Sequence, residues 1–169
     1  MGCSTGQEPY SIAITIHEWC RLNPGTGLIP SDFVIFASDI SDKVLNVARL
    51  GIYSRDEVAR GVPDNLLATY FCKHQRGYSV ADEVRSLIQF RELNLSQPIQ
   101  YIGKFDLLLC RNVMIYFSTE LRKRIVRQFH EMLQPEGFLL LGSSETIYGL
   151  SDAFSTEHRG ETNVYRAVK

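Results

Sequence analysis

A glycine-rich stretch at the start of the chain has the residue types of a cofactor-binding loop. Gly2 and Gly6 flank small and hydroxylic residues, and Pro9 follows where a helix could begin. Glycine lets a backbone approach a ligand closely or adopt a positive φ, and proline suits the first turn of a helix. A glycine-rich turn that leads into a helix N-terminus holds nucleotide-like cofactors in α/β folds. The same pattern also fits a plain structural turn, so residues further along the chain must decide.

Two carboxylates narrow the class of ligand. Asp39 follows an apolar run, where an acidic residue can accept hydrogen bonds from ribose hydroxyls or can serve only in a cap or turn. Glu8 lies at the entry of the first predicted helix, where it could be a cap favoured by the helix dipole or could reach an amino group of a ligand. Together they favour a cofactor with a ribose and a positive charge. S-adenosylmethionine (SAM) fits better than NAD, and the absence of a pyrophosphate explains why the full G-x-G-x-x-G spacing is not needed.

The elements that would position these residues alternate between helices and buried strands. Amphipathic spacing predicts helices over residues 9–21, 41–51 and 118–132, with Ser41 and Ser118 as caps. A continuous apolar run predicts a buried strand at residues 33–37, and further strands are expected at 88–93, 104–110 and 138–141, the last after a turn at 134–137. Two further strands, at 154–157 and 163–168, are expected to form a closing hairpin. This alternation predicts a doubly wound α/β sheet, so the strand-end residues Asp39, Asn94, Arg111 and Asn112 become site candidates.

The segment at residues 52–87 interrupts this alternation. Its patterning is looser, with a turn or helix start at Pro63 and partial alternation from Tyr78 to Val84. We interpret it as an insertion that contains a short helix and small antiparallel strands.

Composition excludes several other classes of function. The sequence is 44% hydrophobic and 22% charged, with a formal net charge of -1, which is globular and argues against a large nucleic-acid or anionic-membrane surface. Its four cysteines include no Cys-x-x-Cys pair, and its histidines form no ligand pair at helical spacing, so no metal site is predicted. Reduced thiols in a cytoplasmic protein are the expectation. No stretch reaches the roughly 20 apolar residues that would span a bilayer.

Three stretches, taken in order, resemble the chemotaxis receptor methyltransferases of the CheR type. They are GCSTGQEPYS at residues 2–11, FASDI at 36–40 and CRNVMIYF at 110–117. The resemblance extends over essentially the whole chain, and the third stretch is highly specific. It implies a class I SAM-dependent methyltransferase (Rossmann-like) domain over residues 1–169, with helices on both faces of the sheet, a C-terminal antiparallel hairpin and a small inserted β-subdomain at 52–87.

The resemblance also implies an activity and a set of site residues. Members of the family transfer a methyl group from SAM to glutamate side chains on the cytoplasmic helical domain of chemoreceptors, leaving S-adenosylhomocysteine (SAH). Some dock a receptor C-terminal peptide at the inserted subdomain. The implied cofactor contacts lie in the loop and at the strand ends: Gly2, Gly6, Glu8, Asp39, Asn94, Leu95, Arg111 and Asn112. Tyr116 would lie near the transferred methyl, either donating a hydrogen bond or walling the pocket, and Arg111 could also orient a carboxylate.

The implied chemistry agrees with the residues present. A glutamate side chain is ionised at neutral pH, so it needs no general base to attack a sulfonium methyl group. Catalysis would then depend mainly on holding the two reacting groups in line. A sequence without a Ser-His-Asp set is consistent with this.

The chain departs from the family pattern at its start. The helical domain that precedes this region in the family is not in the sequence, nor is the first strand of the sheet. We therefore expect a truncated methyltransferase that binds SAM weakly, is catalytically poor and forms oligomers through exposed sheet edges. Three alternatives are an inactive module that binds receptor tails, an amino-directed methyltransferase and an NAD-type dehydrogenase. The second is weak because Asn112 is not followed by Pro-Pro, and the third because the full glycine spacing is lacking.

Overall fold

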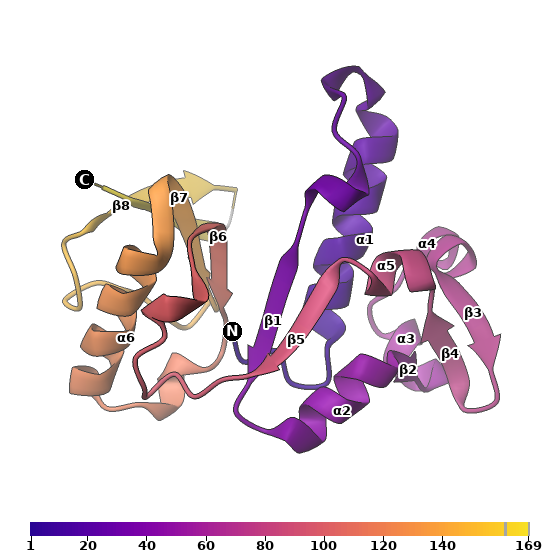
Figure 1. Ribbon diagram of the computed structural model, residues 1–169, viewed down its shortest axis with the longest axis horizontal. Helices are drawn as coiled ribbons and strands as arrows, with labels where there is room; N and C mark the ends of the chain where they lie inside the picture. Colours follow the sequence, from indigo (N-terminus) through magenta and orange to yellow (C-terminus); the bar gives the residue numbers. More distant parts are fainter. Residues whose placement is uncertain (161, 169) are drawn as a thin grey trace. The chain divides into compact units, whose positions relative to one another are not determined.

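The computed structural model describes residues 1–160 and 162–168, which form two compact units (Figure 1). The amino-terminal unit is Cys3–Glu92, and the carboxy-terminal unit combines Met1–Gly2 with Leu93–Lys169. Among the described residues, no helix has the length and apolar character that a bilayer crossing would need.

The amino-terminal unit is built on a parallel pair of strands. β1 (Ile35–Asp39) pairs with β5 (Ile88–Glu92), with Ile35 opposite Ile88 and Asp39 opposite Glu92. This confirms the parallel arrangement predicted for these strands, although β1 begins and ends two residues later than expected. The helices and short turns of this part are α1 (Gln7–Leu22), η1 (Pro24–Thr26), η2 (Pro30–Asp32) and α2 (Asp42–Leu50).

Helix α1 carries the side chains that join these elements. Tyr10 is buried, and its hydroxyl donates a hydrogen bond of 2.8 Å to the carbonyl oxygen of Ala48 in α2. Its ring makes edge contacts with Tyr53 and with Phe90 of β5. Aromatic edge contacts add to the stabilisation from area burial, so one side chain ties α1 to both α2 and the sheet.

A second, antiparallel sheet occupies residues 52–80 of the same unit. Its strand order is β2-β4-β3, from β2 (Ile52–Tyr53), β4 (Gly77–Val80) and β3 (Phe71–His74). Three short helices accompany it: α3 (Arg55–Ala59), α4 (Asp64–Tyr70) and α5 (Asp82–Arg85). Small antiparallel strands were expected here, and the assignment of residues 52–87 as a separate subdomain stays a prediction.

The carboxy-terminal unit is a four-stranded sheet with order β6-β7-β9-β8. β6 (Phe105–Cys110) and β7 (Leu133–Leu141) are parallel, while β8 (Phe154–Arg159) and β9 (Thr162–Ala167) form the predicted antiparallel hairpin (Figure 1, yellow). The crossover between β6 and β7 contains η4 (Met114–Tyr116) and α6 (Thr119–Met132), and η3 (Gln100–Ile102) precedes β6.

Helix α6 contributes four fully buried side chains to the core of this unit. Ile125, Val126, Phe129 and Met132 are each 0% exposed, as the predicted helical spacing requires. Ser118 caps the helix as expected, because its hydroxyl accepts a hydrogen bond of 3.3 Å from the backbone N–H of Leu121.

The predicted turn at residues 134–137 is wrong, because these residues lie within β7. Phe105 pairs with Leu133 and Leu107 pairs with Phe138, so β7 carries extra residues opposite Asp106. The left-handed φ of +66° at Glu136 accommodates them. Proline and glycine here produce a bulge within the strand instead of ending it.

Candidate functional site

The glycine-rich loop is fastened to the carboxyl end of β1. The backbone N–H of Cys3 donates to the carbonyl oxygen of Ser38 at 2.8 Å, and the N–H of Gly6 donates to the carbonyl of Cys3 at 3.0 Å. Between them, the N–H of Ser4 donates to Asp39 Oδ2 at 2.9 Å. The strand-end carboxylate therefore fixes the loop conformation.

Gly6 lets the loop enter α1 while its backbone lies close to Ala48 and Tyr53. Its φ is +95° and it occupies the N-cap position of the helix. A Cβ at Gly6 would lie 3.0 Å from the Cβ of Ala48 and 3.1 Å from the hydroxyl oxygen of Tyr53. That hydroxyl donates to the carbonyl oxygen of Thr5 at 2.8 Å. Burial raises the pKa of Tyr53, so this hydroxyl stays protonated as a donor.

The carboxylate of Asp39 accepts one backbone hydrogen bond on each oxygen. Besides Ser4, the N–H of Ser41 donates to Asp39 Oδ1 at 3.1 Å. Ser41 is the N-cap residue of α2 but makes no side-chain capping bond, which corrects the predicted cap: its backbone N–H is held by Asp39 instead. A carboxylate has about four acceptor positions, so Asp39 keeps capacity for ligand hydroxyls. Glu8 lies in the first turn of α1 and is half-buried.

The other predicted site residues belong to the carboxy-terminal unit. Gly2 has a φ of +69° and lies against Val113, whose side chain a Cβ at this position would overlap. Asn94 is exposed and its Oδ1 accepts a hydrogen bond of 2.9 Å from the N–H of Ser96, forming a turn after β5. Leu95 is buried in the core of the unit, so its side chain packs there and is not available to a ligand.

The segment after β6 is held by Glu145, a residue that no sequence pattern predicted. Glu145 Oε2 accepts hydrogen bonds from the backbone N–H groups of Asn112 (2.7 Å) and Gly142 (2.9 Å). Its Oε1 accepts from those of Val113 (3.0 Å) and Met114 (2.7 Å). Its position after a predicted strand could have marked Glu145 as a candidate. It follows the apolar run at residues 138–141, just as Asn112 follows the predicted strand at 104–110.

The side chain of Tyr116, at the end of this segment, is exposed to solvent. It ends η4 and is 80% exposed, whereas Met114 at the start of η4 is 1% exposed. The buried methionine anchors the turn, and the phenol is left available for a ligand. Arg111 and Asn112 are also exposed.

The structure therefore groups the predicted residues by unit. Gly6, Glu8 and Asp39 gather where the loop, α1 and β1 meet in the amino-terminal unit. Gly2, Asn94, Leu95, Arg111, Asn112 and Tyr116 belong to the carboxy-terminal unit.

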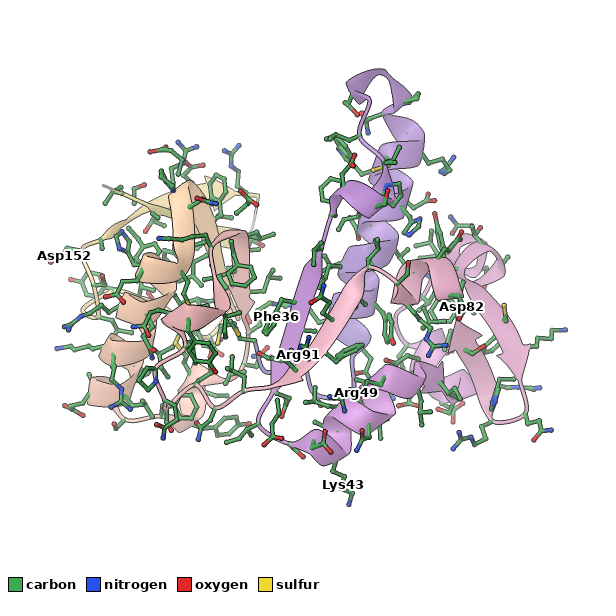
Figure 2. All side chains as sticks on the ribbon, viewed as in Figure 1. Phe36, Lys43, Arg49, Asp82, Arg91 and Asp152 are labelled. Atoms are coloured by element: carbon green, nitrogen blue, oxygen red, sulfur yellow. The ribbon has the colours of Figure 1, made fainter. Side chains whose placement is uncertain are left out.

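A cavity of about 480 Å³ in the amino-terminal unit contains none of the predicted residues. It is lined by Tyr10, Arg49, Asp82, Arg85, Ser86, Ile88 and Phe90, of which Figure 2 labels Arg49 and Asp82. Arg85 contacts Asp82 at 3.2 Å and donates to the carbonyl oxygen of Arg49 at 3.0 Å. The bond to Arg49 joins α5 to the end of α2.

The cysteines are free thiols, as expected. Cys3, Cys20 and Cys110 are buried and Cys72 is exposed. Burial raises the pKa of the Cys3 thiol to about 11. Within residues 1–160 and 162–168, no group of three or more His, Cys, Asp or Glu side chains could hold a metal ion.

Comparison with known proteins gives a consistent result. A protein-family model described as "CheR methyltransferase, SAM binding domain" matches residues 1–162. A chemotaxis protein methyltransferase of Vibrio parahaemolyticus is 43% identical over 89% of the chain and 54% of that protein. Chemotaxis protein methyltransferase 1 of Pseudomonas aeruginosa is 37% identical over 98% of the chain and 60% of that protein. The chain thus spans little more than half the length of these curated relatives.

Two solved structures show the same fold at low identity. Magnesium protoporphyrin IX methyltransferase from Synechocystis, with bound SAM, matches with a TM-score of 0.51 and 16% identity, covering 99% of this chain and 67% of that one. The N-methyltransferase NodS from Bradyrhizobium japonicum, in complex with SAH, matches with a TM-score of 0.51 and 13% identity, covering 80% and 67%. The fold is that of the class I SAM-dependent methyltransferases, as predicted.

Proposed function

Because the chain belongs to the CheR methyltransferase SAM-binding domain family, whose cofactor is SAM, we propose that it methylates chemoreceptors. The reaction is transfer of a methyl group from SAM to receptor glutamate side chains, forming glutamyl methyl esters in chemotaxis adaptation. The observation that carries the proposal is the family match over residues 1–162, which includes both the glycine-rich loop and the segment from Cys110 to Phe117. Relatives named chemotaxis protein methyltransferase support it.

The donor set fits this cofactor. We assign the ribose hydroxyls to Asp39, whose carboxylate has acceptor positions beyond its two backbone bonds. Glu8, a half-buried carboxylate, suits the α-amino group. The remaining proposed contacts lie in the loop and after the strands of the carboxy-terminal unit: Gly2, Gly6, Asn94, Leu95, Arg111 and Asn112.

When bound, SAM would supply a methyl group on a positively charged sulfur: the carboxylate oxygen bonds to the methyl carbon as the carbon–sulfur bond breaks, and SAH is the leaving group. The acceptor glutamate is ionised at neutral pH, so the protein need not remove a proton. The task of this chain is to orient the carboxylate and to exclude water. The exposed phenol of Tyr116 can donate a hydrogen bond to that carboxylate, and Arg111 can pair with it.

The partners follow from the same proposal. We assign the substrate surface to the cytoplasmic helical domain of a chemoreceptor, and the protein to the cytoplasm. A receptor C-terminal peptide is proposed to dock at residues 52–87. There β3 is the edge of the three-stranded sheet and Cys72, Lys73 and His74 are exposed, an arrangement that suits addition of an extended peptide. Self-association of the chain is a further proposal, which light scattering tests.

An alternative is a module with the methyltransferase fold that binds receptor tails without performing chemistry. Isothermal titration with SAM and with a receptor C-terminal peptide, alongside transfer of a labelled methyl group to a receptor cytoplasmic domain, separates the two. Methyl transfer supports the enzyme. Peptide binding without SAM binding or methyl transfer supports the module.

Two substitutions with matched controls sharpen this experiment. Tyr116→Phe should lower the rate of methyl transfer with little effect on SAM affinity, whereas Tyr101→Phe, at an equally exposed tyrosine (80%), should change neither. Asp39→Asn should weaken SAM binding, whereas Asp56→Asn, at an exposed aspartate, should not. If Tyr116→Phe transferred methyl groups as fast as Tyr101→Phe, or if Asp39→Asn bound SAM as tightly as Asp56→Asn, the corresponding assigned role would be contradicted.

A further inference from the structure

We propose that Glu145 is a positioning residue that fixes the conformation of the segment Arg111–Met114 and so places Arg111 and Asn112 for the cofactor. The inference rests on the proposed function for those two residues. The loop after β7 would thereby hold the loop after β6 in its binding conformation.

The geometry of the carboxylate carries the first step. Glu145 receives four backbone N–H groups at 2.7 to 3.0 Å, three of them from the consecutive residues Asn112, Val113 and Met114. Hydrogen bonds to an ionised acceptor are stronger than neutral ones. The backbone reaches this arrangement through the left-handed φ of +59° at Asn112, a conformation that asparagine tolerates better than most residues. Successive N–H groups then face one point and form an anion-binding concavity.

The number of hydrogen bonds that Glu145 accepts indicates that it positions the backbone and does not contact the ligand directly. Each of its oxygens already accepts two hydrogen bonds, and a carboxylate offers about four acceptor positions in all. Asp39, by contrast, accepts one bond on each oxygen. Glu145 has therefore no acceptor position left for a ligand, and it acts through the backbone that it holds.

Gly142 provides independent support. A Cβ at this position would lie 2.7 Å from Glu145 Oε2 and 2.9 Å from the backbone nitrogen of Asn112. Both distances are too short for a side chain, so the glycine lets the end of β7 approach the segment after β6. The close approach and the carboxylate together specify one arrangement of the two loops.

Substitution of Glu145 by glutamine tests the inference. Glutamine keeps the shape of the side chain but has one carboxamide oxygen, so it can accept only some of the four hydrogen bonds. Its NH₂ group is a donor and cannot accept a hydrogen bond from the remaining backbone N–H groups. We expect Glu145→Gln to weaken SAH binding by about 10-fold to 100-fold, since small displacements of positioning groups have effects of this size. Glu136→Gln is the matched control: Glu136 is exposed in the same unit and contacts Arg166 at 3.0 Å. It should leave the SAH dissociation constant within about two-fold.

Titration is done at a temperature at which circular dichroism shows both variants folded, so that lost stability alone does not change the affinity. Glu145→Asp, which keeps the charge but is one methylene shorter, should fall between the wild type and Glu145→Gln. A folded Glu145→Gln protein that binds SAH as tightly as the control would overturn the inference.

Amide hydrogen exchange supplies a second measurement on the unsubstituted protein without ligand. The N–H groups of Asn112, Val113, Met114 and Gly142 should be protected, and exchange as fast as an open loop would overturn the inference even if no variant folds. If the unsubstituted protein fails to bind SAH, the proposed function fails. Protection of these amides then still decides whether Glu145 holds the segment.

Discussion

Replacing Gly6 by alanine should destabilise the amino-terminal unit through two separable effects. The φ of +95° forces an L-residue into the left-handed region, which costs about 1–2 kcal/mol. The new methyl group would lie 3.0 Å from Ala48 Cβ and 3.3 Å from Ala48 Cα, and overpacking of this kind costs about 1–3 kcal/mol. The free energy of unfolding should therefore fall by about 2–5 kcal/mol.

Two other glycines of the same unit separate these effects. Gly27 has a φ of +73° with open space where a Cβ would stand, so Gly27→Ala should show only the backbone cost. Gly25 has open space and no such φ, so Gly25→Ala should change the unfolding free energy by no more than about 0.5 kcal/mol.

The assay is urea unfolding followed by the fluorescence of Trp19, the single tryptophan of the sequence, which lies in α1 and reports on this unit. Combining Gly6→Ala with Ala48→Gly removes the nearest contact, so the double variant should be less destabilised than the sum of the single ones by about 1 kcal/mol. If Gly6→Ala lowers the free energy of unfolding by no more than Gly27→Ala does, the close approach of Gly6 to α2 does not contribute to the destabilisation.

Three further outcomes are expected. The hydrogen bond from Arg21 lowers the pKa of Glu18 to about 2; the stabilisation is therefore present above the ordinary carboxyl pKa of 4.5 and is lost as the pH falls toward 2, so urea midpoints of the wild type and Glu18→Gln should converge between pH 5 and 2. Phe129→Ala should lower the free energy of unfolding of the carboxy-terminal unit by about 3–5 kcal/mol, measured by circular dichroism in urea, because this side chain is 0% exposed. Iodoacetamide at pH 8 should modify the exposed Cys72 well before the buried Cys3, whose thiol has a pKa of about 11; mass spectrometry that finds equal labelling would contradict the burial of Cys3.

The predictable part of the fold is the part that depends on local patterning. The candidate strands at residues 33–37, 88–93 and 104–110 located β1, β5 and β6 to within two residues, and the helical spacing of residues 118–132 located α6 together with its Ser118 cap. The segment 134–137 failed because proline and glycine indicate a turn in sequence. Whether such residues end a strand or bulge within it depends on the neighbouring strand, and here β6 continues the pairing on both sides.

In the site, too, some residues could be predicted from the local sequence and others depend on the fold. Asp39 and Asn112 could be found because strand ends in an α/β sheet are expected ligand positions. Glu145 also follows a strand, but Gly-Ser-Ser stands between them, so its position alone does not distinguish it from an ordinary loop residue. Its role arises only when the fold brings the loop after β7 beside the loop after β6.

The parallel pairing of β1 with β5 has a consequence for how the chain folds. This pairing joins residues 35–39 to residues 88–92, so all of residues 40–87 must be enclosed before its first hydrogen bond can form. The entropy of closing such a loop delays this step. The hairpin of β8 and β9, whose strands are separated by two residues of sequence, meets no such delay. We therefore expect the amino-terminal unit to acquire its sheet late, with the antiparallel sheet of residues 52–80 able to form first and shorten the loop that remains to be closed.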